Sequence, residues 1–183
     1  MKAALALAAG IVLGAVLYAY APDLLLKTGS AEPPHNFIAI TDRLHTSGQP
    51  SEAQLKGLAR SGYGLVVNLA PPTTTGSLPN EGALVAGNGI AYVNIPVDWD
   101  KPRYEDFVLF SDVLRRAGER RVLVHCQMNF RASTFTFLYR VVHQGVDPAL
   151  AYDQVTAVWA PHDRWKAFAR EVLAGHRIDF EPY

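Results

Sequence analysis

Three short segments with apolar centres, together with stretches of helical spacing elsewhere in the chain, constrain the fold of this chain most strongly. The segments are Leu65–Leu69, Ala91–Ile95 and Arg121–His125. Apolar residues between the second and third segments recur every three or four positions, as Phe107 and Phe110 do. Continuous apolar runs are typical of strands buried on both faces, and intervening helices allow neighbouring strands to run parallel. The sequence therefore predicts an α/β fold with a central, mainly parallel sheet flanked by helices.

Local signals mark where several of the predicted helices begin. Ser51 and Gln54 have the spacing of a capping box at a helix start. Asp147 and Pro148 combine a capping side chain with a proline suited to the first helical position. Another helix is expected to begin near Ala132, directly after the third predicted strand and a short loop.

The N-terminal region has a composition of its own. Residues 3–21 contain no charged side chain, and as a helix they would reach about 28 Å, close to the thickness of a bilayer core. Ala19–Ala21 also has the small-residue form of a signal-peptide cleavage site. Residues 1–26 are therefore predicted to be a membrane anchor or a signal segment.

The predicted domain organisation follows from this assignment. Residues 27–36 contain Gly, Ser and Pro and are expected to form a linker, and residues 37–183 are expected to form the globular domain. An uncleaved helix would leave a single-pass protein with its domain exported, with Lys2 on the cytoplasmic side. A cleaved segment would leave a periplasmic or extracellular protein.

Charge and cysteine content exclude several classes of protein. Lys and Arg together number 17, as do Asp and Glu, so the formal net charge is zero and no nucleic-acid partner is expected. The single cysteine, Cys126, excludes an internal disulfide and a CxxC motif. No two histidines have the spacing of a helical zinc pair, and no metal site is predicted.

Cys126 lies where the third predicted strand ends, in the stretch V-L-V-H-C-Q-M-N-F-R. In parallel sheets, ligands bind at the carboxyl ends of the strands. The helix predicted to follow would present free N–H groups there, which favour an anion and stabilise a thiolate. Arg131 adds a planar guanidinium suited to a phosphate-like oxyanion. These features indicate a site for nucleophilic attack on phosphorus.

The pattern V-H-C-x-x-x-x-R resembles the signature loop of the cysteine-dependent protein tyrosine and dual-specificity phosphatases. The stretches L-H-T-S-G-Q-P-S and Y-V-N-I-P-V-D-W-D-K-P also resemble segments of bacterial dual-specificity-like members. The similarity spans roughly residues 37–175. It implies a tyrosine-phosphatase-like fold and a phosphorylated protein or a small phosphoester as substrate, with no cofactor.

The resemblance also implies roles for individual residues. Cys126 would be the nucleophile that forms a phosphocysteine, and His125 would order the loop. Asp98 or Asp100 would protonate the leaving oxygen. Arg131 would bind the phosphoryl oxygens. The predicted phosphate-binding set consists of Gln127, Met128, Asn129, Phe130, Arg131 and Ser133.

The loop departs from the phosphatase pattern in length and composition. Such loops usually have five residues between Cys and Arg, including a glycine, whereas this chain has four and no glycine. Asn129 is the candidate substitute, because Asn tolerates the left-handed backbone conformation. Ala132 stands where a hydroxyl is expected, and Ser133 follows. Two alternative functions therefore remain open. One is a rhodanese-like sulfurtransferase with a Cys126 persulfide, and the other is a pseudophosphatase that binds phosphorylated groups without turnover.

Overall fold

The computed structural model describes residues 32–183. The predicted anchor or signal segment, residues 1–26, and the first part of the linker lie outside these residues. The compact unit spans Pro34–Tyr183. No helix among residues 32–183 is long and apolar enough to cross a membrane.

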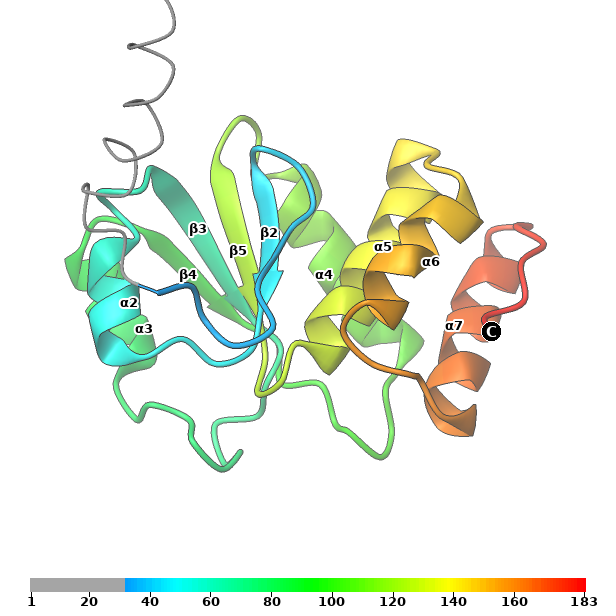
Figure 1. The fold of residues 1–183 in the computed structure, drawn as a ribbon, viewed down its shortest axis with the longest axis horizontal. Helices are drawn as coiled ribbons and strands as arrows, with labels where there is room; N and C mark the ends of the chain where they lie inside the picture. The colour runs from blue at the N-terminus through cyan, green and yellow to red at the C-terminus, as the bar shows by residue number, and fades with distance from the viewer. Residues whose placement is uncertain (1–31) are drawn as a thin grey trace, which may run out of the picture. The chain divides into compact units, whose positions relative to one another are not determined.

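A single sheet of five strands forms the centre of this unit (Figure 1). The strands are β1 (Ile38–Ala39), β2 (Leu44–Ser47), β3 (Tyr63–Asn68), β4 (Ala91–Asn94) and β5 (Arg121–His125), in the spatial order β1-β2-β5-β3-β4. β2, β5, β3 and β4 run parallel, and only β1 is antiparallel to its neighbour. The predicted mainly parallel sheet is therefore confirmed, and its carboxyl ends meet at one edge.

Helices cover both faces of the sheet, as predicted. They are α2 (Glu52–Gly57), α3 (Glu81–Gly87), α4 (Tyr104–Arg115), α5 (Phe130–Gln144), α6 (Pro148–Thr156) and α7 (Asp163–Gly175). In Figure 1, α2 and α3 lie on one side of the sheet, and α4 to α7 lie on the other. The capping box at Ser51 forms, and the Asp147 side chain accepts the N–H of Leu150 ahead of Pro148.

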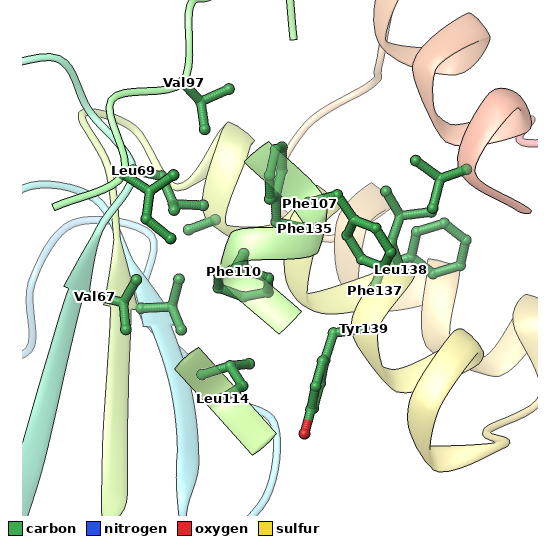
Figure 2. Packing of buried hydrophobic residues seen from close by; sticks show 14 of the residues in the cluster. Val67, Leu69, Val97, Phe107, Phe110, Leu114, Phe135, Phe137, Leu138 and Tyr139 are labelled. Atoms are coloured by element: carbon green, nitrogen blue, oxygen red, sulfur yellow. The ribbon is translucent and has the colours of Figure 1, made fainter. Parts of the chain in front are cut away.

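The apolar runs in β3 and β5 serve two separate cores. Val66 and Leu123 pack with Leu55 of α2 in the smaller core. The next residues along these strands, Val67 and Val124, point to the opposite face and join the larger core under α4 to α7. Figure 2 shows this larger core, with Val67 of the sheet lying across from Phe110 and Phe135. Strands buried on both faces need apolar residues at successive positions, which explains their continuous apolar sequence.

The sequence did not predict three elements. The short strands β1 and β2 lie in the L-H-T-S stretch and before it, and α3 follows the Pro- and Thr-rich segment after β3. β2 has polar residues among its four positions, so it lacks a continuous apolar run, although Thr46 and Ser47 are buried. α3 has seven residues and no hydrogen bond from its N-cap side chain. Signals this short are weak, but both β2 and α3 contribute to the candidate site.

Candidate active site

Cys126 lies at the carboxyl edge of the sheet, immediately after β5. Its N–H donates to the carbonyl of Ser47, at the end of β2, over 3.3 Å, which fixes the start of the loop. The thiol-bearing residue is 1% exposed and borders a cleft of about 700 Å³. The cleft is lined by Pro71, Thr73, Thr74, Pro96, Asp98, Trp99, Cys126, Gln127, Met128, Phe130 and Arg131. The predicted nucleophile, cation and one acid candidate therefore share one cleft.

Arg131 lies in the first turn of α5, and its side chain is almost fully buried, with 4% of the residue exposed. One terminal nitrogen donates to the carbonyl of Val97 over 3.0 Å, and the guanidinium lies 5.9 Å from the centre of the Trp99 ring. Nε is buried and has no hydrogen-bond partner within residues 32–183. A buried N–H without an acceptor is costly, and Arg131 lines the cleft, so its guanidinium is suited to an anionic ligand there.

The two acid candidates have different environments. Asp98 lines the cleft, and one of its carboxylate oxygens accepts the backbone N–H of Asp100 over 2.8 Å. Asp100 is not part of the cleft lining and pairs with Arg164 of α7 over 2.6 Å. Of the two acid candidates, Asp98 therefore shares the cleft with Cys126, and Asp100 pairs with a residue outside the cleft lining.

His125 is held by a buried polar network. Its Nε2 lies 2.8 Å from a carboxylate oxygen of Glu81, at the start of α3, and both residues are buried. Glu81 also accepts hydrogen bonds from Gln49 and Asn68, over 2.5 and 3.2 Å. Burial is the largest influence on the Glu81 carboxyl and raises its pKa. The hydrogen bond and charge of His125, with the hydrogen bonds of Gln49 and Tyr92, together outweigh burial, so the pKa is lowered.

The network holds the ring of His125, the residue for which the resemblance implies a role in ordering the loop. A carboxylate accepts hydrogen bonds, so the proton of the bonded imidazole lies on Nε2, facing Glu81. The ring is thereby fixed one residue before Cys126. Sequence reasoning missed Glu81, and the only local signal was its place in the first turn of a short helix.

The predicted phosphate-binding set divides into two groups. Gln127, Met128 and Phe130 line the cleft together with Arg131. Asn129 and Ser133 are not part of this lining, and both residues are buried. The Ser133 hydroxyl donates to the Phe130 carbonyl over 3.1 Å, inside α5.

Asn129 adopts the left-handed conformation that its sequence position predicted, with φ of 71°. It is the N-cap residue of α5, but its side chain makes no capping hydrogen bond. The first N–H groups of a helix have no acceptor within the helix. Because the N-cap side chain leaves them free, these groups can serve an anion beside Cys126.

Aromatic side chains form one wall of the cleft. Phe130 stacks on Trp159, with ring centres 4.7 Å apart. Trp99 packs against Trp159 and Trp165, with ring centres 5.5 and 5.2 Å away. The three tryptophans of the chain therefore lie together beside the segment that carries Asp98. Another part of the lining comes from the Pro- and Thr-rich loop after β3, where the carbonyl of Thr75 accepts a hydrogen bond from the Gln127 side chain over 3.1 Å.

Within residues 32–183, no group of three or more His, Cys, Asp or Glu side chains is placed to hold a metal ion. The chemistry available at this cleft is that of a thiol, a guanidinium, backbone N–H groups and a carboxylic acid. Together they can bind a tetrahedral oxyanion, attack its central atom and protonate a leaving group.

Two crystal structures of a DUF442 protein from Shewanella putrefaciens CN-32, a proposed phosphatase, are similar to this chain. In one, the proteins are 34% identical with a TM-score of 0.71, over 80% of this chain and 98% of that one. In the other, the identity is 36% and the TM-score 0.72, over 78% and 94%. TpbA of P. aeruginosa in complex with phosphotyrosine is 21% identical with a TM-score of 0.64, over 82% and 96%, which shows a shared fold.

A comparison of sequences finds a match that covers a smaller share of both proteins. The chain is 30% identical over 128 residues to a beta-lactamase hydrolase-like protein of Xylella fastidiosa, strain Temecula1. The match covers 68% of this chain but only 28% of the length of that protein. No protein-family model matches the chain.

The fold and the loop from Cys126 to Arg131 place the chain in the superfamily of cysteine-dependent tyrosine and dual-specificity phosphatases, as the resemblance implied. Within this superfamily, the chain belongs to the DUF442 family.

Proposed function

We propose that this protein is a phosphatase that hydrolyses phosphomonoesters through a phosphocysteine intermediate. The observation that carries the proposal is the buried, unpartnered Nε of Arg131, in a residue that lines the same cleft as Cys126 and Asp98. A phosphoryl group would supply the missing acceptor and lie beside the thiol.

The reaction has two steps. The Cys126 thiolate attacks phosphorus, so that an S–P bond forms and the P–O bond to the leaving group breaks, while Asp98 donates a proton to the departing oxygen. Arg131 and the first N–H groups of α5 hold the three phosphoryl oxygens. Water then attacks phosphorus with Asp98 as the base, and the S–P bond breaks. The Cys126 thiolate is regenerated, and inorganic phosphate is released.

The lining of the cleft supports a singly phosphorylated substrate with an apolar leaving group. Arg131 is the only cation among the described residues that line it, and the Asp98 carboxylate would repel additional phosphates. Trp99, Met128 and Phe130 supply apolar surface instead. We expect kcat/KM to be higher for an aryl monophosphate than for ATP or polyphosphate, and the opposite order would contradict this assignment.

The proposal is tested by assaying the full-length chain on para-nitrophenyl phosphate in the presence of a chelator, beside Cys126→Ser. Wild-type turnover that Cys126→Ser abolishes is the expected result. Full activity in the Cys126→Ser protein would refute the phosphocysteine mechanism. A folded wild type that binds phosphate without turnover would instead indicate the phospho-group-binding function. Sulfur transfer from thiosulfate without phosphatase activity would indicate the sulfurtransferase.

We further propose that the domain is exported, either anchored through residues 3–21 or released after cleavage. The support is the uncharged sequence of this segment. Membrane fractionation and N-terminal sequencing of the expressed protein test the proposal. A soluble cytosolic protein with an intact N-terminus would contradict both forms of it.

A further inference from the structure

The backbone of the S-G-Q-P stretch is hydrogen-bonded both to the Cys126–Arg131 loop and to the start of the domain. The N–H of Gly48 donates to the carbonyl of His35 over 2.7 Å, and the N–H of Gln49 donates to the carbonyl of Gln127 over 2.9 Å. A Cβ at position 48 would lie 2.9 Å from the Gln127 carbonyl oxygen and 3.0 Å from that of His35. Gly48 is therefore required for the close approach of these three backbone segments.

Two left-handed asparagines complete the contact between the start of the domain and the loop. Asn36 and Asn129 have φ values of 51° and 71°, and among the described residues only one other non-glycine residue has a positive φ. The Asn36 side chain donates to the Met128 carbonyl over 3.0 Å. The Asn129 side chain donates to the Asn36 carbonyl over 2.6 Å and to the Thr46 hydroxyl over 3.0 Å.

We propose that Asn36 and Asn129 form a clasp that positions the Cys126–Arg131 loop for binding an oxyanion. By the resemblance stated above, a glycine usually permits the left-handed turn in such loops. Here the turn is made by Asn129, and its side chain is held by Asn36, from outside the loop. Asn36 is thus a positioning residue of the site, although it lies 90 positions before Cys126.

The clasp also explains how the loop presents its N–H groups. The side chain of an N-cap Asn normally accepts an N–H from the first turn of its helix. In this protein, the side-chain nitrogen of Asn129 is turned toward Asn36 and Thr46, and no capping hydrogen bond forms. The first N–H groups of α5 are thereby left for the thiolate and for a bound anion.

The reactivity of the thiol tests the clasp directly, because Cys126 is the only cysteine of the chain. The rate of alkylation by iodoacetamide is measured against pH for the full-length wild type, Asn36→Gly and Asn129→Gly. Glycine accepts the left-handed backbone, so each substitution removes side-chain hydrogen bonds without introducing backbone strain. Asn88→Gly is the matched control, since it also removes a side-chain-to-backbone hydrogen bond, of 2.7 Å, at the far end of α3.

We expect alkylation at neutral pH to slow by about three- to tenfold in both clasp variants, in line with the loss of one or two hydrogen bonds. The pH profile should move to higher pH, because fewer N–H groups then stabilise the thiolate. If the clasp only stabilised the fold, the variants would have a lower melting temperature, but their folded forms would keep the wild-type pH profile of alkylation.

If folded Asn36→Gly keeps the wild-type pH profile of alkylation, the proposal is overturned. Asn36 is half-buried, and if Asn129→Gly does not fold, Asn36→Gly alone decides the test. The effect of the clasp on turnover rests on the proposed phosphatase function, but the alkylation test does not. If the wild type fails to hydrolyse aryl phosphates while both variants still slow alkylation, the proposed function fails and the clasp stands.

Discussion

Replacing Glu81 by Gln tests whether the buried network under His125 supports the site. Glu81 is 4% exposed, and its two carboxylate oxygens accept from His125, Gln49 and Asn68. Glutamine has the same shape, but it is neutral, and its amide nitrogen donates where the carboxylate accepts. At least one of these donors then loses its acceptor.

The expected loss of stability follows from these contacts. A hydrogen bond to a charged group contributes about 1.5–3 kcal/mol, and a buried donor left without a partner costs about 1–3 kcal/mol. Because rotation of Gln49 can restore part of the bonding, we expect a net loss of about 2–3 kcal/mol in the free energy of unfolding. For a domain of this size, such a loss lowers Tm by about 4–12 °C.

The pH dependence has a definite sign. The pKa of Glu81 in the folded protein is lowered from its ordinary value of 4.5. Its stabilising contribution is therefore complete above pH 4.5 and is lost as the pH falls through the lower folded-state pKa. The difference in stability between wild type and Glu81→Gln should be constant near neutral pH and narrow in the acid range.

Urea unfolding at several pH values measures this difference, with Glu52→Gln as the control. Glu52 is an exposed carboxylate paired with Lys56 over 2.5 Å, so no comparable loss is expected there. Alkylation of Cys126 measures the effect on the site. The reasoning is refuted if Glu81→Gln loses no more stability than Glu52→Gln, or if its stability deficit stays the same down to pH 3.

Three further predictions concern the cleft and its loop. Arg131→Lys should lower kcat/KM for an aryl phosphate by about 10²-fold or more, because an ammonium cannot replace the two-donor guanidinium edge, and tryptophan fluorescence should register weaker phosphate binding. Asp98→Asn should lower kcat by about 10²- to 10⁴-fold for a poor leaving group, while Asp100→Asn should change it little; similar losses in both would sink the assignment of Asp98. Gly48→Ala should destabilise the fold by about 1–3 kcal/mol, measured by urea unfolding, because its Cβ would lie 2.9 Å from the Gln127 carbonyl, and a neutral effect would contradict the required close approach.

Contiguity in the sequence explains which parts of the site were predictable. Cys126 and Arg131 lie in one stretch where a strand, a loop and a helix follow each other, so the topology brings them together without any long-range information. The left-handed turn at Asn129 was predictable for the same reason, since the loop has no glycine. The sheet was predictable because strands buried on both faces have an unbroken apolar sequence.

The rest depends on contacts between segments that are distant in sequence. Sequence spacing alone does not separate Asp98 from Asp100, and the distinction comes from Arg164, 64 positions further on. Glu81 reaches His125 across 44 positions, from a helix too short to be recognised by its periodicity. A single sequence gives neither the register of the sheet nor the packing of α3 and α7 that creates these contacts.

These distant contacts matter most because the loop is short. Three of the contacts that hold it are those of the His125 ring with Glu81, of the Met128 carbonyl with the Asn36 side chain, and of the Arg131 guanidinium with the Val97 carbonyl. None of the three anchoring groups takes part in the proposed bond-making steps, and each comes from a different element of the fold. The Cys-x4-Arg motif therefore supplies reactive groups but not their placement. A variant that keeps Cys126 and Arg131 but loses two of the three anchors should remain folded and lose most of its thiolate reactivity. Full reactivity in such a variant would show that the loop adopts its conformation without these anchors.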